Sequence, residues 1–445
     1  MTDIEIAIDQ KVTPWETSNT RVDYMKLIKQ FGCDPIDGRL IKRFEQVTRM
    51  KAHPWLRRGL FFSQKYLELI LNDYEAGCPI YLYTGRGPSS KSMHLGHMIP
   101  FMFTKWLQEA FDAILIIQMS DDEKFYFKGG SLEEYNQLTY ENAKDIIACG
   151  FNPDKTFIFS NLRTLGGELY ANVVRIMTTT CNQMRGIYGL TLDNTVGQMS
   201  WPCFQCAPAY SNSFPDILHP TGPYNELLDG SKVYIGSHIR CLVPMAIDQD
   251  PYFRMARDFA DRYHVKGYLK PATIHSKFLV GLGGIDSKMS STNSTAIPTI
   301  YMTDDVSTIP KKINKYAFSG GGATLKEHIQ YGGNLEVDVS YQWLLYFLDD
   351  DEELQKIAKE YSAGTMSTGQ IKKKVSDVVC ELISKHQNER DKVTNEVLRH
   401  YFNRSRKFDH TRTERPPIEL ESDEVYATYG INFDPMFGTI QKSGT

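Results

Sequence analysis

A glycine-rich segment in the first quarter of the chain has residue types suited to holding a nucleotide. Residues 84–97 read TGRGPSSKSMHLGH and follow a short strand-like run. Gly85 and Gly87 let the backbone approach a ligand closely, and Gly96 leaves room for a flat purine base. A helix starting within the segment would offer free N–H groups and its positive dipole end to phosphate. The segment therefore predicts a nucleotide site at the end of a strand, where open α/β sheets place their ligands.

Three side chains of this segment are candidates for phosphate contacts. His94 and His97 would donate hydrogen bonds to phosphate oxygens, and Arg86 would neutralise phosphate charge. Two histidines three residues apart also occur as ordinary polar residues of a helix. The glycine-rich strand exit before them favours the nucleotide interpretation.

A second segment far downstream, residues 286–291, reads DSKMSS. It follows the glycine-containing residues 281–284, which are typical of a loop. Lys288 on such a loop could reach the β and γ phosphates and stabilise charge as pyrophosphate departs, and Ser290 and Ser291 could donate to the same oxygens. Taken alone, a string of this kind is more often part of a solvated loop. The nucleotide interpretation therefore depends on the two segments together.

The composition is that of a globular chain. Its 445 residues suggest two or three domains, and 41% hydrophobic and 23% charged residues are ordinary values. No apolar run approaches the roughly 18 residues that span a bilayer, and the first residues include acids and no apolar stretch. We therefore expect a cytoplasmic protein with no membrane or DNA partner. A net charge of −4 excludes a nucleic-acid binder that uses its whole surface.

The eight cysteines do not indicate a disulfide framework. They are scattered, and such a framework is unusual in a long chain without a secretory signal. Cys203 and Cys206 have the spacing of metal ligands, but the chain has no second pair of this kind. We expect small buried side chains here and no metal site in the protein.

The elements that must position these residues alternate between strands and helices. Between residues 76 and 302, strand runs such as 113–119 alternate with helical patterns such as 133–149. This alternation predicts an α/β catalytic domain with a doubly wound, parallel, Rossmann-like sheet. Residues 216–237 contain several Pro and Gly and are expected to be an insertion near the mouth of the site, either a lid or, more simply, a surface loop.

Helices are predicted on both sides of this domain. Residues 1–75 should be mainly helical, with a helix over 61–71 that begins near Ser63, although periodicity leaves a hairpin open for part of the segment. Residues 303–408 predict an all-helical C-terminal domain, in which the acids at 349–353 fit the first turn of a helix. Residues 409–445 are expected to be a tail.

The two chemistry-bearing segments, in this order and at this separation, resemble the HxGH and KMSKS signatures of class I aminoacyl-tRNA synthetases. Residues 246–254, AIDQDPYFR, resemble a signature of the tryptophanyl-tRNA synthetases of the eukaryotic and archaeal type. Residues 81–90, 117–124 and 317–321 also resemble that family. The likeness runs from about residue 12 to about residue 408.

The resemblance implies ATP-dependent activation of L-tryptophan to tryptophanyl-adenylate, with Mg²⁺, and transfer to the 3′ end of tRNA(Trp) by a homodimer. Some residues match the family's catalytic groups: Arg86, His94, His97 and Lys288. Others match its ATP contacts: Gly85, Gly87, Gly96, Met289, Ser290 and Ser291. A third set matches its tryptophan contacts: Tyr83, Gln118, Glu123, Gln205 and Gln249.

Within the tryptophan set, Tyr83 and Gln118 match positions that serve the indole N–H, and the other three match positions around the substrate ammonium. A site that accepts the indole hydrogen bond leaves a buried acceptor unpaired when phenylalanine binds, so it can discriminate strongly. Without the resemblance, Gln205 would be read as a buried amide between two cysteines and Tyr83 as an ordinary core residue.

The chain departs from the family pattern at few places. Thr292 follows Ser291 where family members often carry serine, which keeps a hydroxyl. The tail has no recognised counterpart, and an appended N-terminal helical hairpin found in some members is absent. The helical region occupies the place of the anticodon-binding domain. Its residues 371–410 hold ten Lys or Arg against six Asp or Glu, about +4, which could meet tRNA phosphates or simply be a solvated face.

Three other functions are open on the sequence. Tyrosyl-tRNA synthetase shares both motifs, but residues 246–254 disfavour it. A small adenylyltransferase would not need a large helical domain. A non-catalytic relative would be expected to lack His94, His97 or Lys288, and all three are present.

Overall fold

A seven-stranded sheet forms the centre of the protein in a computed structural model that describes residues 22–228, 230, 232–288 and 297–434, with the backbone alone for 285–288. The strands lie in the order β1 (Asp34–Pro35), β2 (Phe61–Lys65), β9 (Ala272–Ser276), β8 (Arg240–Ala246), β3 (Ile80–Arg86), β4 (Ile114–Met119), β5 (Thr156–Ser160). From β9 to β5 all neighbours are parallel. β1 and β2 add an antiparallel edge. The predicted doubly wound sheet is confirmed.

The direction of strand addition reverses between β3 and β8. From β3 the chain continues outward to β4 and β5, whereas β8 starts on the other side of β3 and is followed by β9. In open α/β sheets, ligands bind beyond the carboxyl ends of the strands at such a reversal.

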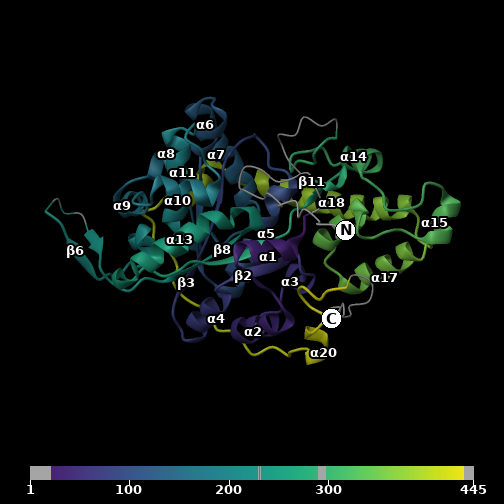
Figure 1. Cartoon of the computed structure of the whole chain (residues 1–445), viewed down its shortest axis with the longest axis horizontal. Helices are drawn as coiled ribbons and strands as arrows, with labels where there is room; N and C mark the ends of the chain where they lie inside the picture. The colour runs from purple at the N-terminus through teal and green to yellow at the C-terminus, as the bar shows by residue number, and fades with distance from the viewer. Residues whose placement is uncertain (1–21, 229, 231, 289–296, 435–445) are drawn as a thin grey trace, which may run out of the picture.

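Helices cover both faces of the sheet (Figure 1). All residues of β4 are buried, as expected for a strand packed on both sides. One face packs against α4 (Leu67–Glu75), α5 (Leu95–Phe111) and α7 (Leu132–Ile147). The other packs against α9 (Gly167–Ile176), α11 (Val196–Cys206) and α13 (Asp250–Arg262).

The residues before β3 are largely helical, and they also contribute two strands to the sheet. They form α1 (Tyr24–Phe31), α2 (Gly38–Thr48), α3 (Pro54–Arg57) and α4, with β1 and β2 between them. The expected helix over 61–71 is therefore wrong in its first half. Phe61 packs into one hydrophobic core and Phe62 into another, as alternate residues of a strand do. Tyr66, in the left-handed region at φ 62°, separates β2 from α4.

The described residues from 303 to 408 form helices joined by loops, without a strand, which confirms the predicted all-helical region, most of which lies on the right of Figure 1. Its helices are α14 (Ile309–Tyr316), α15 (Leu325–Tyr331), α16 (Val339–Phe347), α17 (Asp351–Ser362), α18 (Thr368–Asp391) and α19 (Asn395–Phe402). The acids at 349–353 begin α17 as expected, since Asp350 caps it by accepting from the N–H groups of Glu352 and Glu353.

The tail runs back across the body of the protein. It passes beneath α4 and α2 to the short helix α20 (Asp423–Tyr426) in Figure 1. Lys155 Nζ donates to the Thr411 carbonyl at 2.5 Å, the Arg412 guanidinium lies 3.3 Å from the ring centroid of Tyr74, and buried Tyr426 donates to Glu45 at 2.6 Å. The described part of the tail is thus docked by side-chain contacts.

The insertion at 216–237 contains the hairpin of β6 (Tyr224–Glu226) and β7 (Lys232–Tyr234), which projects at the left of Figure 1. None of its described residues lines the cavity described below. Its described part is therefore a surface excursion away from that cavity, not a lid over its mouth.

Candidate active site

A cavity of about 320 Å³ opens where the strand order reverses. Its walls come from the ends of β3, β8 and β9 and from the start of α5. We call it the central cavity. Most of the residues predicted for the site line it: Tyr83, Gly85, Arg86, Gly87, His94, Gly96, His97, Glu123, Gln205 and Gln249.

The remaining predicted residues lie elsewhere. Gln118, in β4, is behind Tyr83 and is not part of the cavity wall. Lys288 ends β11 (Gly284–Lys288), which forms a hairpin with β10 (Val280–Gly281), just after the cavity residue Leu279. Its side chain lies outside the described part, as do Met289, Ser290, Ser291 and Thr292.

Two glycines leave room for close packing where the chain leaves β3. A Cβ atom on Gly87 would lie 2.1 Å from Glu123 Oε2, and one on Gly85 would lie 3.1 Å from the Gln118 carbonyl oxygen. Any larger residue at position 87 would displace the Glu123 carboxylate from the turn. The turn therefore brings backbone and a carboxylate to the cavity together.

The two histidines stack at the start of α5. His94 is the N-cap residue, and its Nδ1 accepts from the His97 backbone N–H at 3.3 Å. The ring centroids are 3.4 Å apart. Because Nδ1 is an acceptor, a neutral His94 carries its proton on Nε2 and can donate there. His94 thus stabilises the helix start and also offers a donor in the cavity wall.

Charges of both signs meet beside the turn. Burial lowers the pKa of Arg86 to about 10, with Glu123 and Asp145 acting in the opposite direction, so the guanidinium stays charged at neutral pH. Glu123 accepts from Ser120 Oγ at 3.1 Å and from Lys124 Nζ at 2.9 Å. A cation for phosphate and a carboxylate for an ammonium therefore lie side by side.

At the base of the cavity, Tyr83 is fully buried and its hydroxyl has two possible acceptors. They are Gln118 Oε1 at 2.6 Å and the Gln205 carbonyl oxygen at 2.9 Å. Burial raises the pKa of Tyr83 well above its usual value, so the phenol stays protonated. An N–H donor entering the cavity would meet the hydroxyl oxygen of Tyr83, which in turn donates to Gln118 behind it.

Comparison with known proteins places this site in a family. A family model described as class I tRNA synthetases (W and Y) matches residues 75–384. The chain is 48% identical over 405 residues to the cytoplasmic tryptophan–tRNA ligase of Oryctolagus cuniculus, covering 89% of this chain and 81% of that protein. It is 47% identical over 410 residues to the cytoplasmic tryptophan–tRNA ligase of Schizosaccharomyces pombe, covering 90% and 99%.

The chain belongs to the tryptophan–tRNA ligases. The resemblance read from its motifs is confirmed. The synthetase also matches the crystal structure of an Encephalitozoon cuniculi tryptophanyl-tRNA synthetase bound to tryptophan, with a TM-score of 0.73, 36% identity, and coverage of 86% of this chain and 99% of that one. Among the described residues, no helix combines the length and apolar composition needed to cross a membrane.

Several residues of the synthetase cavity were not predicted from the sequence. Among them are the polar or charged residues Lys124, Asp248, Ser276 and Lys277. Lys277 lies just beyond β9, and burial lowers the pKa of its ammonium to about 8. A general rule that cationic side chains at strand ends can face ligands would have identified Lys277. The rule could not be applied because β9 itself was not recognised in the sequence.

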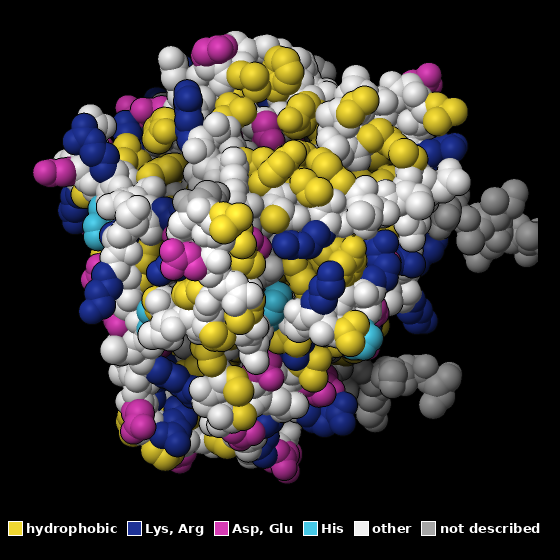
Figure 2. Space-filling model, turned by 90° about the vertical axis from the view of Figure 1, so that its left-hand side faces the viewer, with side chains coloured by type: hydrophobic (Ala, Val, Ile, Leu, Met, Phe, Trp, Pro, Cys, Tyr) yellow, Lys and Arg dark blue, Asp and Glu magenta, His cyan; other side chains and the backbone are white. Residues whose placement is uncertain are grey.

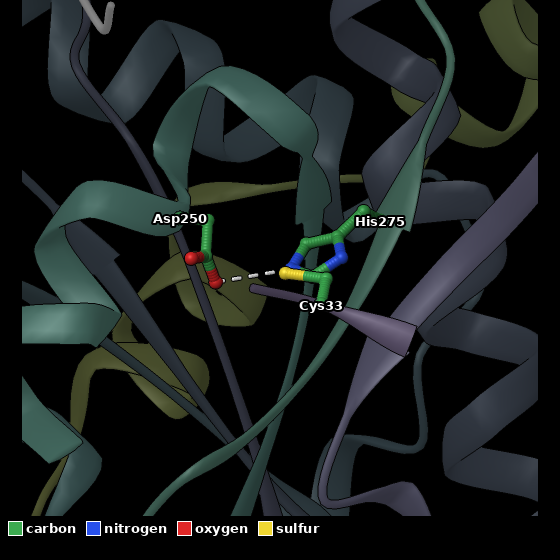
Figure 3. Close-up of side chains that lie close together, drawn as sticks. All are labelled: Cys33, Asp250 and His275. Atoms are coloured by element: carbon green, nitrogen blue, oxygen red, sulfur yellow. Dashed lines mark hydrogen bonds and ion pairs between the residues drawn. The ribbon is translucent and has the colours of Figure 1, made fainter. Parts of the chain in front are cut away.

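A buried network holds β9 against the start of α13 (Figure 3). Asp250 accepts from His275 Nε2 at 3.1 Å and from Arg257 Nη2 at 2.9 Å, and His275 Nδ1 accepts from Ser63 Oγ at 2.9 Å. Burial alone would raise the pKa of Asp250, but the hydrogen bond from His275 and the charge of Arg257 hold it well below its usual value. The network fixes the neighbouring cavity residues Gln249 and Ser276.

Cys33 lies next to this network, so three potential metal ligands meet there: Cys33, Asp250 and His275. Burial raises the pKa of the Cys33 thiol to about 12, and a metal would need the thiolate. The Arg257 guanidinium already occupies the Asp250 carboxylate, and both ring nitrogens of His275 have partners. We assign these groups a structural role.

The basic stretch at 371–410 is mostly paired within the protein. Lys374 meets Glu353 at 2.5 Å, Lys373 meets Asp377 at 2.7 Å, and Arg404 meets Asp216 at 2.6 Å. Arg406 donates to the carbonyl oxygens of Pro153 and Thr156. Its excess of positive charge remains, but the individual side chains are less available than the sequence suggested.

Proposed function

We propose that the central cavity is where this synthetase activates L-tryptophan with ATP and from which it charges tRNA(Trp). One observation carries the proposal: the glycine-rich turn, His94, His97 and Tyr83 line the same cavity, and Gln118 is hydrogen-bonded to Tyr83 from behind. The Encephalitozoon cuniculi relative is itself bound to tryptophan. As in the relatives' names, the location is the cytoplasm.

The reaction needs positioning and charge neutralisation but no general base. The tryptophan carboxylate attacks the α-phosphorus in line, a new P–O bond forms, and the bond to the bridging oxygen breaks to release pyrophosphate. Arg86, His94 and His97, with Lys288 from the β10–β11 hairpin, supply donors and positive charge to the phosphates. The ribose hydroxyl of the tRNA end then displaces AMP.

Mg²⁺ would be carried by the ATP phosphates. It binds few protein ligands and keeps several waters beside phosphate oxygens, and Glu123 is already held by Ser120 and Lys124. When bound, the ion would neutralise charge on the departing pyrophosphate. The backbone of Gly85, Gly87 and Gly96 and the segment with Met289, Ser290 and Ser291 complete the proposed ATP site.

Three polar groups are proposed to hold the α-ammonium and its surroundings: Glu123, Gln205 and Gln249. The carboxylate of Glu123 gives a charge-assisted bond. The carbonyl of Gln205 also accepts from Tyr83, so its main chain belongs to the indole subsite. Amino-acid backbone and ring are thus recognised by different walls of one cavity.

The decisive test is pyrophosphate exchange into ATP with tryptophan and, separately, with tyrosine, followed by charging of tRNA(Trp). We expect kcat/KM for tryptophan to exceed that for tyrosine by at least about 10³-fold, because a hydrogen-bonding site rejects a ring that cannot fill it. A preference for tyrosine would overturn the assignment.

We propose a homodimer formed through the face that carries α9. Tyr170, Val174 and Met177 are exposed along that helix, and Leu192 and Val196 are exposed just beyond α10 (Cys181–Tyr188). Hydrophobic side chains gather over the upper part of this side of the molecule (Figure 2). Contiguous exposed apolar surface marks an interaction site. We assign a second copy of this chain to it, because the family resemblance implies a homodimer.

Sedimentation should give twice the chain mass of 50.9 kDa. Val174→Glu, which places charge on the apolar face, should give a monomer, whereas Ile329→Glu, at an exposed position of α15 at the opposite end of the molecule in Figure 1, should leave the dimer intact. A wild-type chain that sediments as a monomer at micromolar concentration would contradict the dimer.

The helical region 303–408 is proposed to hold the anticodon arm of the tRNA, with 1–75, 76–302 and 409–445 as the appended segment, catalytic domain and tail. The local excess of about +4 in residues 371–410 supports phosphate contacts there. No DNA partner is proposed.

A further inference from the structure

A buried chain of side-chain hydrogen bonds leads away from the base of the central cavity. Tyr83 Oη donates to Gln118 Oε1 at 2.6 Å, and Gln118 Nε2 donates to Asn161 Oδ1 at 3.0 Å. Asn161 Nδ2 then donates to Asp122 Oδ1 at 2.9 Å. Gln118 Nε2 also lies 3.0 Å from the carbonyl oxygen of Phe204. These links join β4, the start of α8 (Asn161–Thr164) and the residue before α6 (Glu123–Lys128).

The chemistry of its last member gives this chain a direction. An ionised carboxylate only accepts hydrogen bonds, so Asn161 must turn its NH₂ group toward Asp122. The amide oxygen of Asn161 then faces Gln118, which must donate a hydrogen bond to it from its own NH₂ group. The oxygen of Gln118 is therefore the atom that faces Tyr83. The Phe204 carbonyl, also an acceptor, favours the same orientation.

We propose that Asp122 and Asn161 are positioning residues that set the direction of the Gln118 amide and so make the site prefer a ring with an N–H donor. This rests on the proposed role of Tyr83 and Gln118 in tryptophan binding and deepens it. With Gln118 reversed, its NH₂ group would donate to the Tyr83 hydroxyl oxygen, which would then be less available as an acceptor for the indole N–H.

Burial makes the orientation of the Gln118 amide important for binding. Gln118, Asn161 and Asp122 are 1%, 2% and 5% exposed, so solvent cannot replace a lost partner. Burial raises the pKa of Asp122 to about 7, with the Asn161 hydrogen bond acting in the opposite direction and the charges of Asp121 and Glu123 adding to the rise. At pH 8 the group is mainly the carboxylate, which accepts only. Assays that test the direction therefore belong at that pH.

Asp122→Asn keeps the shape of the side chain. It removes the requirement that Asn161 turn its NH₂ group toward position 122, because an asparagine there can donate to or accept from Asn161. The probe is L-3-benzothienylalanine, in which sulfur replaces the indole N–H. We expect kcat/KM for tryptophan, measured by pyrophosphate exchange at pH 8, to fall roughly tenfold. The loss should lie mainly in the tryptophan KM, and kcat/KM for the analogue and the KM for ATP should stay within about twofold. The tryptophan-to-analogue ratio therefore falls.

Two further variants separate the possible outcomes. Asp121→Asn changes the neighbouring buried carboxylate, which accepts from Asn136 and Ser160 rather than Asn161, and should leave the ratio unchanged. Gln118→Met removes the acceptor itself and should lower the ratio at least as much as Asp122→Asn.

If Gln118→Met lowers the ratio and Asp122→Asn does not, the positioning role is overturned while the tryptophan subsite stands. Equal losses for tryptophan and the analogue in Asp122→Asn would also overturn it, since they would mark a purely structural role. If Gln118→Met leaves the ratio unchanged, the proposed subsite fails and the inference fails with it.

Discussion

Arg86→Ala is expected to slow formation of tryptophanyl-adenylate by about 10²- to 10³-fold while tryptophan binding changes little. The guanidinium is enclosed beside the glycine-rich turn and remains charged although burial lowers its pKa to about 10. Its contacts with Asn142 Oδ1 and Ser89 Oγ are long, 3.4 Å each, so they hold it weakly before phosphate arrives. Single-turnover adenylation and equilibrium binding of tryptophan measure the two effects separately.

Arg86→Lys is the matched control. It keeps a positive charge but loses the planar fork, so its rate should lie between those of the wild type and Arg86→Ala. Lys288→Ala should give the same pattern of slow adenylation with intact tryptophan binding, since the β10–β11 hairpin begins at the cavity wall. A melting temperature close to that of the wild type would show that the folded state is retained. An unchanged adenylation rate would remove Arg86 from the mechanism.

The central part of the sheet could be predicted because its strands contain long apolar runs. The residues of β4 are all buried, and such a run between helical patterns has few other interpretations. The helical C-terminal region was equally readable from its spacing. The break between α18 and α19 was not readable: α18 ends at Asp391, with Lys392 as its C-cap, and Thr394 caps α19. A polar cap inside a periodic pattern is a weak signal in sequence.

Strand β9, which lies between β2 and β8, could not be predicted from its hydropathy pattern alone. In β9, the buried residues Thr273, His275 and Ser276 are polar, so nothing in their hydropathy indicates a core strand. Thr273 and His275 can be buried because Arg257 and Asp250 supply partners from another element. Partners distant in sequence are invisible to a local reading.

The candidate site also contains residues that local sequence patterns could predict and residues that they could not. Residues at the exits of β3 and β8 were predicted because motif and strand end coincide, and the structure brings them to one cavity. Asn161 lies in no recognised motif, and Asp122, although within residues 117–124, was not singled out as a site residue. Their position behind Gln118 depends on the pairing of β4 with β5, which brings their two loops together.

Asp250→Ala is expected to destabilise the folded protein by about 3–5 kcal/mol, because it leaves the buried guanidinium of Arg257 without its counter-charge. It also removes the acceptor of His275 Nε2, so β9 loses its attachment to α13. Denaturant unfolding measures the loss. Since the pKa of Asp250 is held low in the folded state, its stabilisation is present at neutral pH and is lost as pH falls below the usual aspartate value of about 3.9.

Asp258→Ala is the control on the same helix, at an exposed position, and should change stability by no more than about 0.5 kcal/mol. Replacing both partners, as in Asp250→Leu with Arg257→Met, should cost clearly less than the sum of the single changes, because no charge is then left alone. Strict additivity in this double-mutant cycle would show that the ion pair does not hold this part of the fold. The tryptophan KM should rise in Asp250→Ala as well, since Gln249 and Ser276 flank the two halves of the network and line the cavity.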